Sequence, residues 1–151
     1  RLLSAGFGFD SALKVVNSAL LVKSNEESLA TIDCASVDLF TGRVDLYKAG
    51  APATFIVKGN SVTKCELSSM PAGILRGIEF AKRTAVLSRG NLIVMTSDGI
   101  TEAGGEWLQP LLKGCNDCPP QEIADTVLRE ALNIAKDKKE DDMSIIVARL
   151  K

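Results

Sequence analysis

The stretch from Asn91 to Gly99 constrains the fold most, because a buried strand there runs directly into a carboxylate. Residues 92–95 form a continuous apolar run with β-branched side chains, which predicts a strand covered on both faces. The strand must end at Ser97 and Asp98, so a rigid backbone holds the Asp98 carboxylate where it can face a cleft. Gly99 is expected to let the chain turn sharply. The arrangement suits a hard cation, although Asp-Gly is also a common turn, and both interpretations stay open.

Composition excludes several classes of partner and of chemistry. The 151 residues are enough for one domain, expected over residues 1–151, and 46% of them are hydrophobic. With 18 basic and 19 acidic residues, the near-zero net charge gives no electrostatic case for binding nucleic acid or a membrane surface. No uncharged apolar run approaches the roughly 18 residues that a membrane span needs. The chain contains no histidine, so chemistry must use carboxylates, lysines, the backbone or a metal.

The four cysteines fall into two groups. Cys34 and Cys65 lie in apolar, strand-like sequence, where a free cysteine behaves as a small hydrophobe. Cys115 and Cys118 have the spacing of a redox pair or of half a zinc site, but the chain has only this one pair. We favour reduced, structural thiols, as expected in the cytoplasm, and a disulfide is the alternative.

Periodicity and turn residues predict an α+β fold of several strands and two clear helices. A helix capped by Asp10 is expected to pack against a sheet through one apolar face, made of Ala12, Leu13, Val16, Ala19 and Leu20. Strands are expected over residues 29–40, 44–49, 54–57, 61–65, 80–87, 92–95 and 145–148. Gly59-Asn60 is a hairpin signal, and the short turns between successive strands favour an antiparallel meander over strand-helix-strand units.

The chain becomes helical after Gly99. Residues 107–112 form a short apolar piece that Pro110 is expected to interrupt. Pro119-Pro120 then opens a structural helix. Its broad apolar face is expected to contain Ile123, Ala124, Val127, Leu128, Ala131, Leu132 and Ala135.

A second group of acidic residues, Glu140, Asp141 and Asp142, precedes the last apolar strand. If this strand pairs antiparallel with the strand that ends before Asp98, then Asp98 and Asp141 lie at the same edge of one sheet. Two converging carboxylates would repel each other unless a cation lay between them. Mg²⁺ and Mn²⁺ prefer such oxygen ligands, and either ion lowers the pKa of a water enough for attack on phosphorus without histidine. A solvated acidic turn is the alternative for this segment.

Six motifs together resemble the phosphatase domain of the stage II sporulation protein E family, which belongs to the PPM (PP2C-like) metal-dependent serine/threonine phosphatases. The resemblance runs from about residue 9 to residue 151. The motifs are Ser97-Asp98-Gly99, the segment 141–147, Leu39-Phe40-Thr41-Gly42, Lys48-Ala49-Gly50-Ala51-Pro52, Met70-Pro71-Ala72-Gly73-Ile74 and the helix start at 120–125.

The resemblance implies a two-layer antiparallel β-sandwich flanked by α-helices, with two Mn²⁺ or Mg²⁺ ions between the sheets. It implies that Asp98 and Asp141 are the metal ligands and therefore the catalytic residues, with Gly99 and Asp142 beside them. The implied substrate is phosphoserine on a small anti-anti-sigma factor, whose dephosphorylation activates a sporulation sigma factor. The implied location is the cytoplasmic face, with room for a membrane anchor in a preceding region.

One departure from the family pattern matters for activity. The family's first metal-bridging aspartate lies in an Asp-Gly-Met-Gly type turn upstream of the helix that begins near Phe9, and no residue here stands in for it. We therefore expect an N-terminally truncated domain with little or no phosphatase activity, and an uncovered sheet edge that favours a homodimer. The alternative is a non-catalytic interaction or regulatory module, which contacts partners through the helix at 10–22 and the loop at 68–74.

Overall fold

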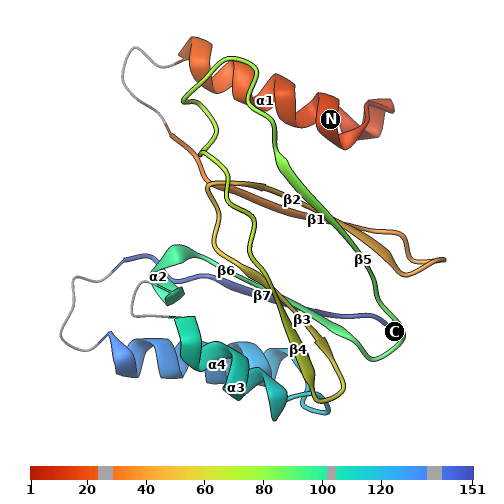
Figure 1. Ribbon diagram of the computed structural model, residues 1–151, viewed down its shortest axis with the longest axis vertical. Coiled ribbons are helices and arrows are strands. Elements are labelled where there is room, and N and C mark those ends of the chain that lie inside the picture. Colours follow the sequence, from red (N-terminus) through yellow and green to blue (C-terminus); the bar gives the residue numbers. More distant parts are fainter. Residues whose placement is uncertain (24–28, 102–104, 136–140) are drawn as a thin grey trace. The chain divides into compact units, whose positions relative to one another are not determined.

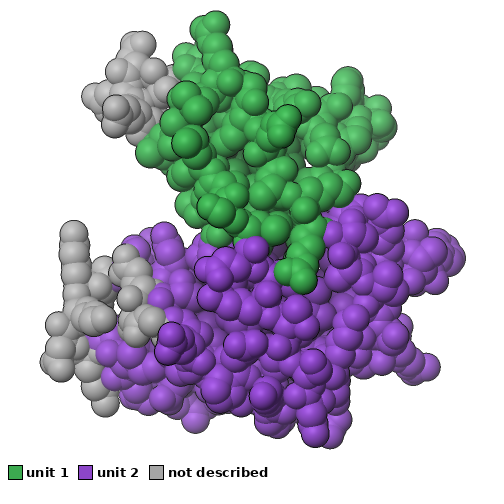
Figure 2. Space-filling model, viewed as in Figure 1, with its two compact units in different colours: residues 1–35, 46–51, 67–83 green, residues 36–45, 52–66, 84–151 purple. Residues whose placement is uncertain are grey.

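The structure is a computed structural model that describes residues 1–23, 29–101, 105–135 and 141–151. The chain divides into two compact units (Figure 2), each described by itself below. The first unit contains residues 1–35, 46–51 and 67–83, and the second contains residues 36–45, 52–66 and 84–151. None of the described helices is long and apolar enough to span a membrane.

The described elements confirm the predicted α+β class, with two antiparallel sheets and flanking helices (Figure 1). The three-stranded sheet has the order β1-β2-β5, and the four-stranded sheet has the order β4-β3-β6-β7. The strands are β1 (Ile32–Val37), β2 (Arg43–Ala49), β3 (Thr54–Lys58), β4 (Ser61–Cys65), β5 (Ala81–Val86), β6 (Leu92–Thr96) and β7 (Ile145–Arg149). The helices are η1 (Leu3–Ala5), α1 (Phe9–Lys23), α2 (Asp98–Thr101), η2 (Gly105–Trp107), α3 (Leu108–Lys113) and α4 (Pro120–Ile134).

The expected simple meander is wrong, because the chain alternates between the two sheets. The strands β1 and β2 belong to one sheet, β3 and β4 to the other, β5 returns to the first, and β6 and β7 complete the second. The hairpin predicted at Gly59-Asn60 is present, with Lys58 opposite Ser61 and Thr54 opposite Cys65. Turn residues therefore identified the hairpin, but they carry no information about which sheet a hairpin joins.

The core of the second unit lies between the four-stranded sheet and the helices α3 and α4, which cover one face of that sheet (Figure 1). Strand β6 is almost entirely buried, as predicted from its continuous apolar run. Helix α4 begins at Pro120, where a missing N–H costs nothing, and buries Ile123, Val127 and Ala131. Leu132 was expected on the same face but is 53% exposed.

The predicted interruption at Pro110 is wrong, because Pro110 lies inside α3. It is the third residue of this helix, and the first turn of a helix contains N–H groups that have no intrahelical acceptor. Proline therefore removes no helical hydrogen bond there. Leu108 and Leu112, on either side of it, are fully buried.

In the first unit, α1 differs from its prediction in its start and in its buried face. The helix begins at Phe9, so Asp10 lies in its first turn instead of capping it. Ala12 and Leu13 are buried as expected, but Val16 is 41% exposed. Phe9 stacks on Tyr47 of β2 with ring centroids 5.2 Å apart, which agrees with the expected packing of this helix against a sheet.

The buried face of α1 is organised around Asn17, which is only 2% exposed. Its Nδ2 donates a hydrogen bond to the carbonyl of Leu75 at 3.0 Å, and its Oδ1 accepts one from the N–H of Gly73 at 2.8 Å. The amide thus joins the helix to the loop between β4 and β5. Periodicity of apolar residues could not find this side, because its central residue is polar.

Strand β1 is shorter than the predicted strand at 29–40, because Asp38 ends it with a turn. Asp38 Oδ1 accepts hydrogen bonds from the N–H groups of Phe40 at 2.8 Å and Thr41 at 3.1 Å, and these bonds lower the pKa of Asp38. Local side-chain bonds therefore override the strand pattern after residue 37.

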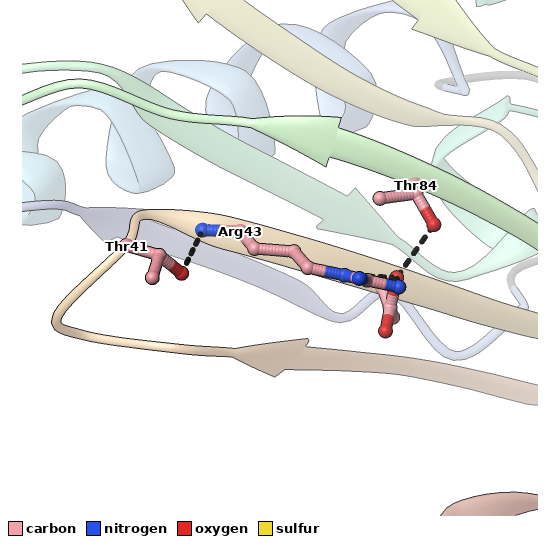
Figure 3. A network of polar contacts seen from close by, with 4 residues as sticks. Thr41, Arg43 and Thr84 are labelled. Atoms are coloured by element: carbon pink, nitrogen blue, oxygen red, sulfur yellow. Dashed lines mark hydrogen bonds and ion pairs between the residues drawn. The ribbon is translucent and has the colours of Figure 1, made fainter.

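Beyond the turn, Asp45 in β2 accepts hydrogen bonds from Arg43 and from the Thr84 hydroxyl (Figure 3).

Candidate metal centre

The pairing of β6 with β7 brings the two predicted acidic segments to one edge of the four-stranded sheet. The strands are antiparallel, with Leu92 opposite Arg149 and Thr96 opposite Ile145. The end of β6 therefore lies beside the start of β7. Asp98 follows β6 by two residues and Asp141 precedes β7 by four, so the antiparallel neighbourhood that the metal hypothesis required is present.

Ser97 fastens these two segments together through three hydrogen bonds. Its N–H donates to the carbonyl of Ser144 at 2.9 Å, and its hydroxyl donates to the carbonyl of Asp142 at 3.0 Å. The same hydroxyl accepts a hydrogen bond from the N–H of Ser144 at 2.9 Å. Sequence reasoning used Ser97 only as a strand-breaking residue. The available signal was a hydroxyl directly after a buried strand, where it can bond to unpaired backbone groups.

Gly99 has a different role from the one predicted. It does not adopt a positive φ, and it lies inside the short helix α2 instead of a sharp turn. A Cβ atom on Gly99 would lie 2.6 Å from the carbonyl oxygen of Asp142 and 3.3 Å from that of Asp141. Glycine is therefore required because another backbone segment approaches closely, and the segment that approaches carries the second predicted ligand.

The two predicted ligands both have exposed side chains. Asp98 Oδ1 accepts a hydrogen bond from the N–H of Gly99 at 3.2 Å, and Asp141 Oδ1 accepts one from the N–H of Asp142 at 2.8 Å. Each carboxylate thus uses one oxygen on the next backbone N–H. Within residues 1–23, 29–101, 105–135 and 141–151, neither carboxylate forms an ion pair.

The donor chemistry at this edge fits a hard divalent cation, because it consists of carboxylate oxygens with backbone carbonyls close by. The number of donors is smaller than a closed site needs. The described part of the chain contains no group of three or more histidine, cysteine, aspartate or glutamate residues that could hold one ion. Asp98 and Asp141 are therefore candidates for part of a metal site, and Asp142 lies beside them.

The cysteines do not extend this centre. All four are free in the structure. Burial, and then the charge of Asp33, raises the pKa of the Cys34 thiol in β1. Cys65 is buried in β4.

Comparison with known proteins identifies the family. The family model described as Stage II sporulation protein E (SpoIIE) matches residues 1–151, which is the whole chain. The chain belongs to the SpoIIE family. This family assignment agrees with the resemblance carried by the six motifs, and it relates the chain to PP2C-like serine phosphatases.

A curated relative and two solved structures show how far the similarity extends. Stage II sporulation protein E of Bacillus subtilis is 31% identical over 156 residues, which cover 99% of this chain but 19% of that protein. The chain thus spans about a fifth of the length of this relative.

The first structure contains the PP2C phosphatase domain and a fragment of the regulatory domain of B. subtilis SpoIIE. It is 32% identical with a TM-score of 0.84, over 98% of this chain and 46% of that one. The second is the B. subtilis SpoIIE phosphatase domain presoaked with manganese, at 31% identity and a TM-score of 0.71, covering 99% of this chain and 68% of that one. The chain is similar to both, and the predicted PP2C-like fold is confirmed.

Proposed function

We propose that this chain is part of a metal-dependent protein phosphatase that hydrolyses phosphoserine, with Asp98 and Asp141 as ligands of Mn²⁺ or Mg²⁺. The observation that carries the proposal is the fastening of both acidic segments at one sheet edge by Ser97. Membership of the SpoIIE family supports the reaction class, and the manganese soak of a similar domain supports the choice of metal. By the same resemblance, the complete domain would hold two ions.

In this proposal the acidic side chains determine where the positive charge of the metal ion lies at the reacting centre. A divalent ion would lower the pKa of a water and so supply a nucleophile near neutral pH, which removes the need for histidine. Asp98 and Asp141 would hold the ion, and each carboxylate accepts a hydrogen bond from the next backbone N–H. Ser97 and Gly99 keep the two segments in contact, and Asp142 adds negative charge beside them.

The substrate of the intact protein would be phosphoserine on a small anti-anti-sigma factor, and its hydrolysis would activate a sporulation sigma factor. We propose that both compact units belong to one phosphatase domain over residues 1–151, at the cytoplasmic face. Two carboxylates hold a cation weakly, so we expect the 151-residue chain alone to turn over little substrate. Strand β7 ends the four-stranded sheet and exposes 62% of Ile146, which favours pairing with a second copy, measurable by sedimentation.

The test uses a protein extended to the length of the B. subtilis phosphatase domain and a phosphoserine protein as substrate. Manganese-dependent phosphate release should fall by more than about 100-fold in Asp98→Asn and in Asp141→Asn, because even residues that only support metal ligands cost 10–100-fold. Asp117→Asn is the matched control, since Asp117 is also exposed in the second unit but lies in the turn before α4. Turnover at the level of the unmodified protein in either ligand variant would refute the site assignment.

A second candidate function is a non-catalytic interaction module, and one observation favours it. Asn17 joins α1 to the loop containing Gly73 and Leu75, so both segments expected to contact partners form one connected surface. Val22 on this helix is 85% exposed. If the module function is the relevant one, Val22→Glu weakens partner capture by the chain while Asp98→Asn leaves it unchanged. If the phosphatase function is the relevant one, Asp98→Asn lowers phosphate release while Val22→Glu leaves it unchanged.

A further inference from the structure

The turn before α4 holds two cysteines close together. The N–H of Cys118 donates a hydrogen bond to the carbonyl of Cys115 at 3.1 Å, which closes a four-residue turn. Residues at the two ends of such a turn have Cα atoms less than about 7 Å apart, and a disulfide needs about 4.4–6.8 Å. Both cysteines are free and half-buried, so a soluble reagent can reach them. The turn thus brings the two Cα atoms close to the separation that a disulfide requires.

The turn is also held from outside by Arg149. One guanidinium nitrogen, Nη2, donates hydrogen bonds to the carbonyl of Asn116 and to that of Cys118, each at 2.6 Å. The Cys115 thiol lies against the carbonyl of Leu111 at 3.3 Å. Burial is the main cause that raises the pKa of the Cys115 thiol, and the charge and hydrogen bonding of Cys118 add to it. The two cysteines therefore lie close enough for the charge of one to affect the other.

We propose that Cys115 and Cys118 form a reversible intramolecular disulfide by exchange with a low-molecular-weight disulfide such as glutathione disulfide. The two cysteines are not part of the candidate metal centre, and the exchange does not depend on phosphatase activity. The turn geometry favours the disulfide alternative that the spacing of these two residues left open.

The exchange proceeds in two balanced steps. The Cys118 thiolate attacks glutathione disulfide, so a bond forms between Cys118 and one glutathione while the other leaves as a thiolate. The Cys115 thiolate then attacks Cys118 sulfur and releases the second glutathione thiolate. The two protein thiols lose two electrons to glutathione disulfide, and their two protons go to the leaving thiolates.

The order of these steps follows from the contacts of Cys115. Its thiol donates a hydrogen bond to the carbonyl of Leu111, which holds the proton on Cys115 sulfur, and burial also raises the pKa of this thiol, so we assign the first attack to Cys118. Once Cys118 carries glutathione, its own thiol no longer contributes charge or a hydrogen bond to Cys115. The two smaller causes that raise the Cys115 pKa then disappear while burial remains, and the turn holds Cys115 next to the mixed disulfide that it resolves.

The experiment treats the full chain with glutathione disulfide and reads the product by intact-mass spectrometry and thiol counting. We expect the loss of two hydrogen atoms and a fall from four titratable thiols to two, both reversed by a dithiol reductant. Cys118→Ser should block this loss, and Cys115→Ser should accumulate one glutathione adduct at Cys118. Cys34→Ser is the matched control, because Cys34 is also half-buried but lies in β1, and it should oxidise like the unmodified protein.

A second measurement separates a preorganised pair from two merely neighbouring thiols. The equilibrium constant for forming the disulfide from glutathione disulfide should fall by about tenfold or more when urea unfolds the chain, because the turn no longer holds the sulfurs together. An equal constant in both states would overturn the proposal. So would glutathione adducts in place of the internal disulfide, or oxidation that survives in Cys118→Ser.

Discussion

Replacing Gly99 by alanine tests the contact on which the candidate metal centre depends. The added Cβ would lie 2.6 Å from the carbonyl oxygen of Asp142, whereas ordinary contacts begin at 3.4 Å. The two segments must therefore separate by about 0.8 Å, the difference between these distances. Both atoms nearest to the new methyl group belong to the backbone of Asp142, so no flexible side chain can move aside.

Two opposing effects set the size of the change in stability. Forcing extra atoms into a packed site costs about 1–3 kcal/mol. Alanine gains up to about 1 kcal/mol over glycine inside a helix, and less in the single turn of α2. The cost of the steric clash should exceed the gain in helix propensity, so the free energy of unfolding should fall by about 1–2 kcal/mol. For a chain of this length, the melting temperature should fall by about 2–8 °C.

The assay combines thermal melting with manganese titration of phosphate release by the extended protein. A displacement approaching 1 Å at a reacting centre can cost about 100-fold, so we expect turnover at limiting manganese to fall by about 10–100-fold. Gly114→Ala is the control, because Gly114 also has a negative φ and its Cβ would meet nothing closer than 3.7 Å. Equal melting temperatures and equal manganese dependence for Gly99→Ala and the unmodified protein would refute the reasoning.

Three further predictions concern the first unit and the β1–β2 turn. Lys48→Met should lower the free energy of unfolding by about 3–5 kcal/mol, because it removes the fully buried ammonium that lies 2.6 Å from the Asp33 carboxylate. Urea unfolding measures this loss, and the double variant with Asp33→Leu should recover most of it. Asn17→Ala should lower the free energy of unfolding by about 1–2 kcal/mol, since the N–H of Gly73 and the carbonyl of Leu75 lose their partner in the buried Asn17 amide, whereas Ser18→Ala on the exposed side should change the urea midpoint little. The lowered pKa of Asp38 means that its carboxylate stabilises the fold above its ordinary value of 3.8 and that this contribution disappears as the pH falls through the folded-state value. Melting curves of Asp38→Asn and the unmodified protein should therefore differ at pH 6 and converge in stronger acid, and a constant difference would contradict the assignment.

The parts of the fold that sequence predicted well are those in which local pattern and burial agree. Residues 92–95 read as a strand covered on both faces, and β6 is such a strand. The helix beginning at Pro120 and the hairpin at Gly59-Asn60 were found because proline and glycine restrict or free the backbone at those positions. The antiparallel neighbourhood of Asp98 and Asp141 could be inferred because acidic residues follow one buried strand and precede another.

The errors arose where a polar group took over a role that periodicity assigns to apolar residues. Asn17 replaces an apolar residue at the centre of the buried side of α1, because its amide has both a donor and an acceptor partner in the loop. Asp38 ends β1 by binding two N–H groups that a longer strand would have used in its ladder. Pro110 is tolerated because it lies in the first turn of α3. The roles of Asn17 and Asp38 depend on partners that no local pattern reveals, whereas the error at Pro110 concerned where its helix begins.

The register of β6 and β7 and the candidate metal centre cannot form independently. Ser97 reaches Asp142 and Ser144 across separations of 45 and 47 residues in the chain, so these bonds exist only after the two strands have paired. A slip of one residue would turn every side chain of one strand to the opposite face. The Ser97 hydroxyl would then lose both of its partners, and Gly99 would no longer lie against Asp142. The two carboxylates therefore reach a common edge only in the register that also buries the apolar side chains of β6, which couples folding of this sheet to formation of the candidate metal centre.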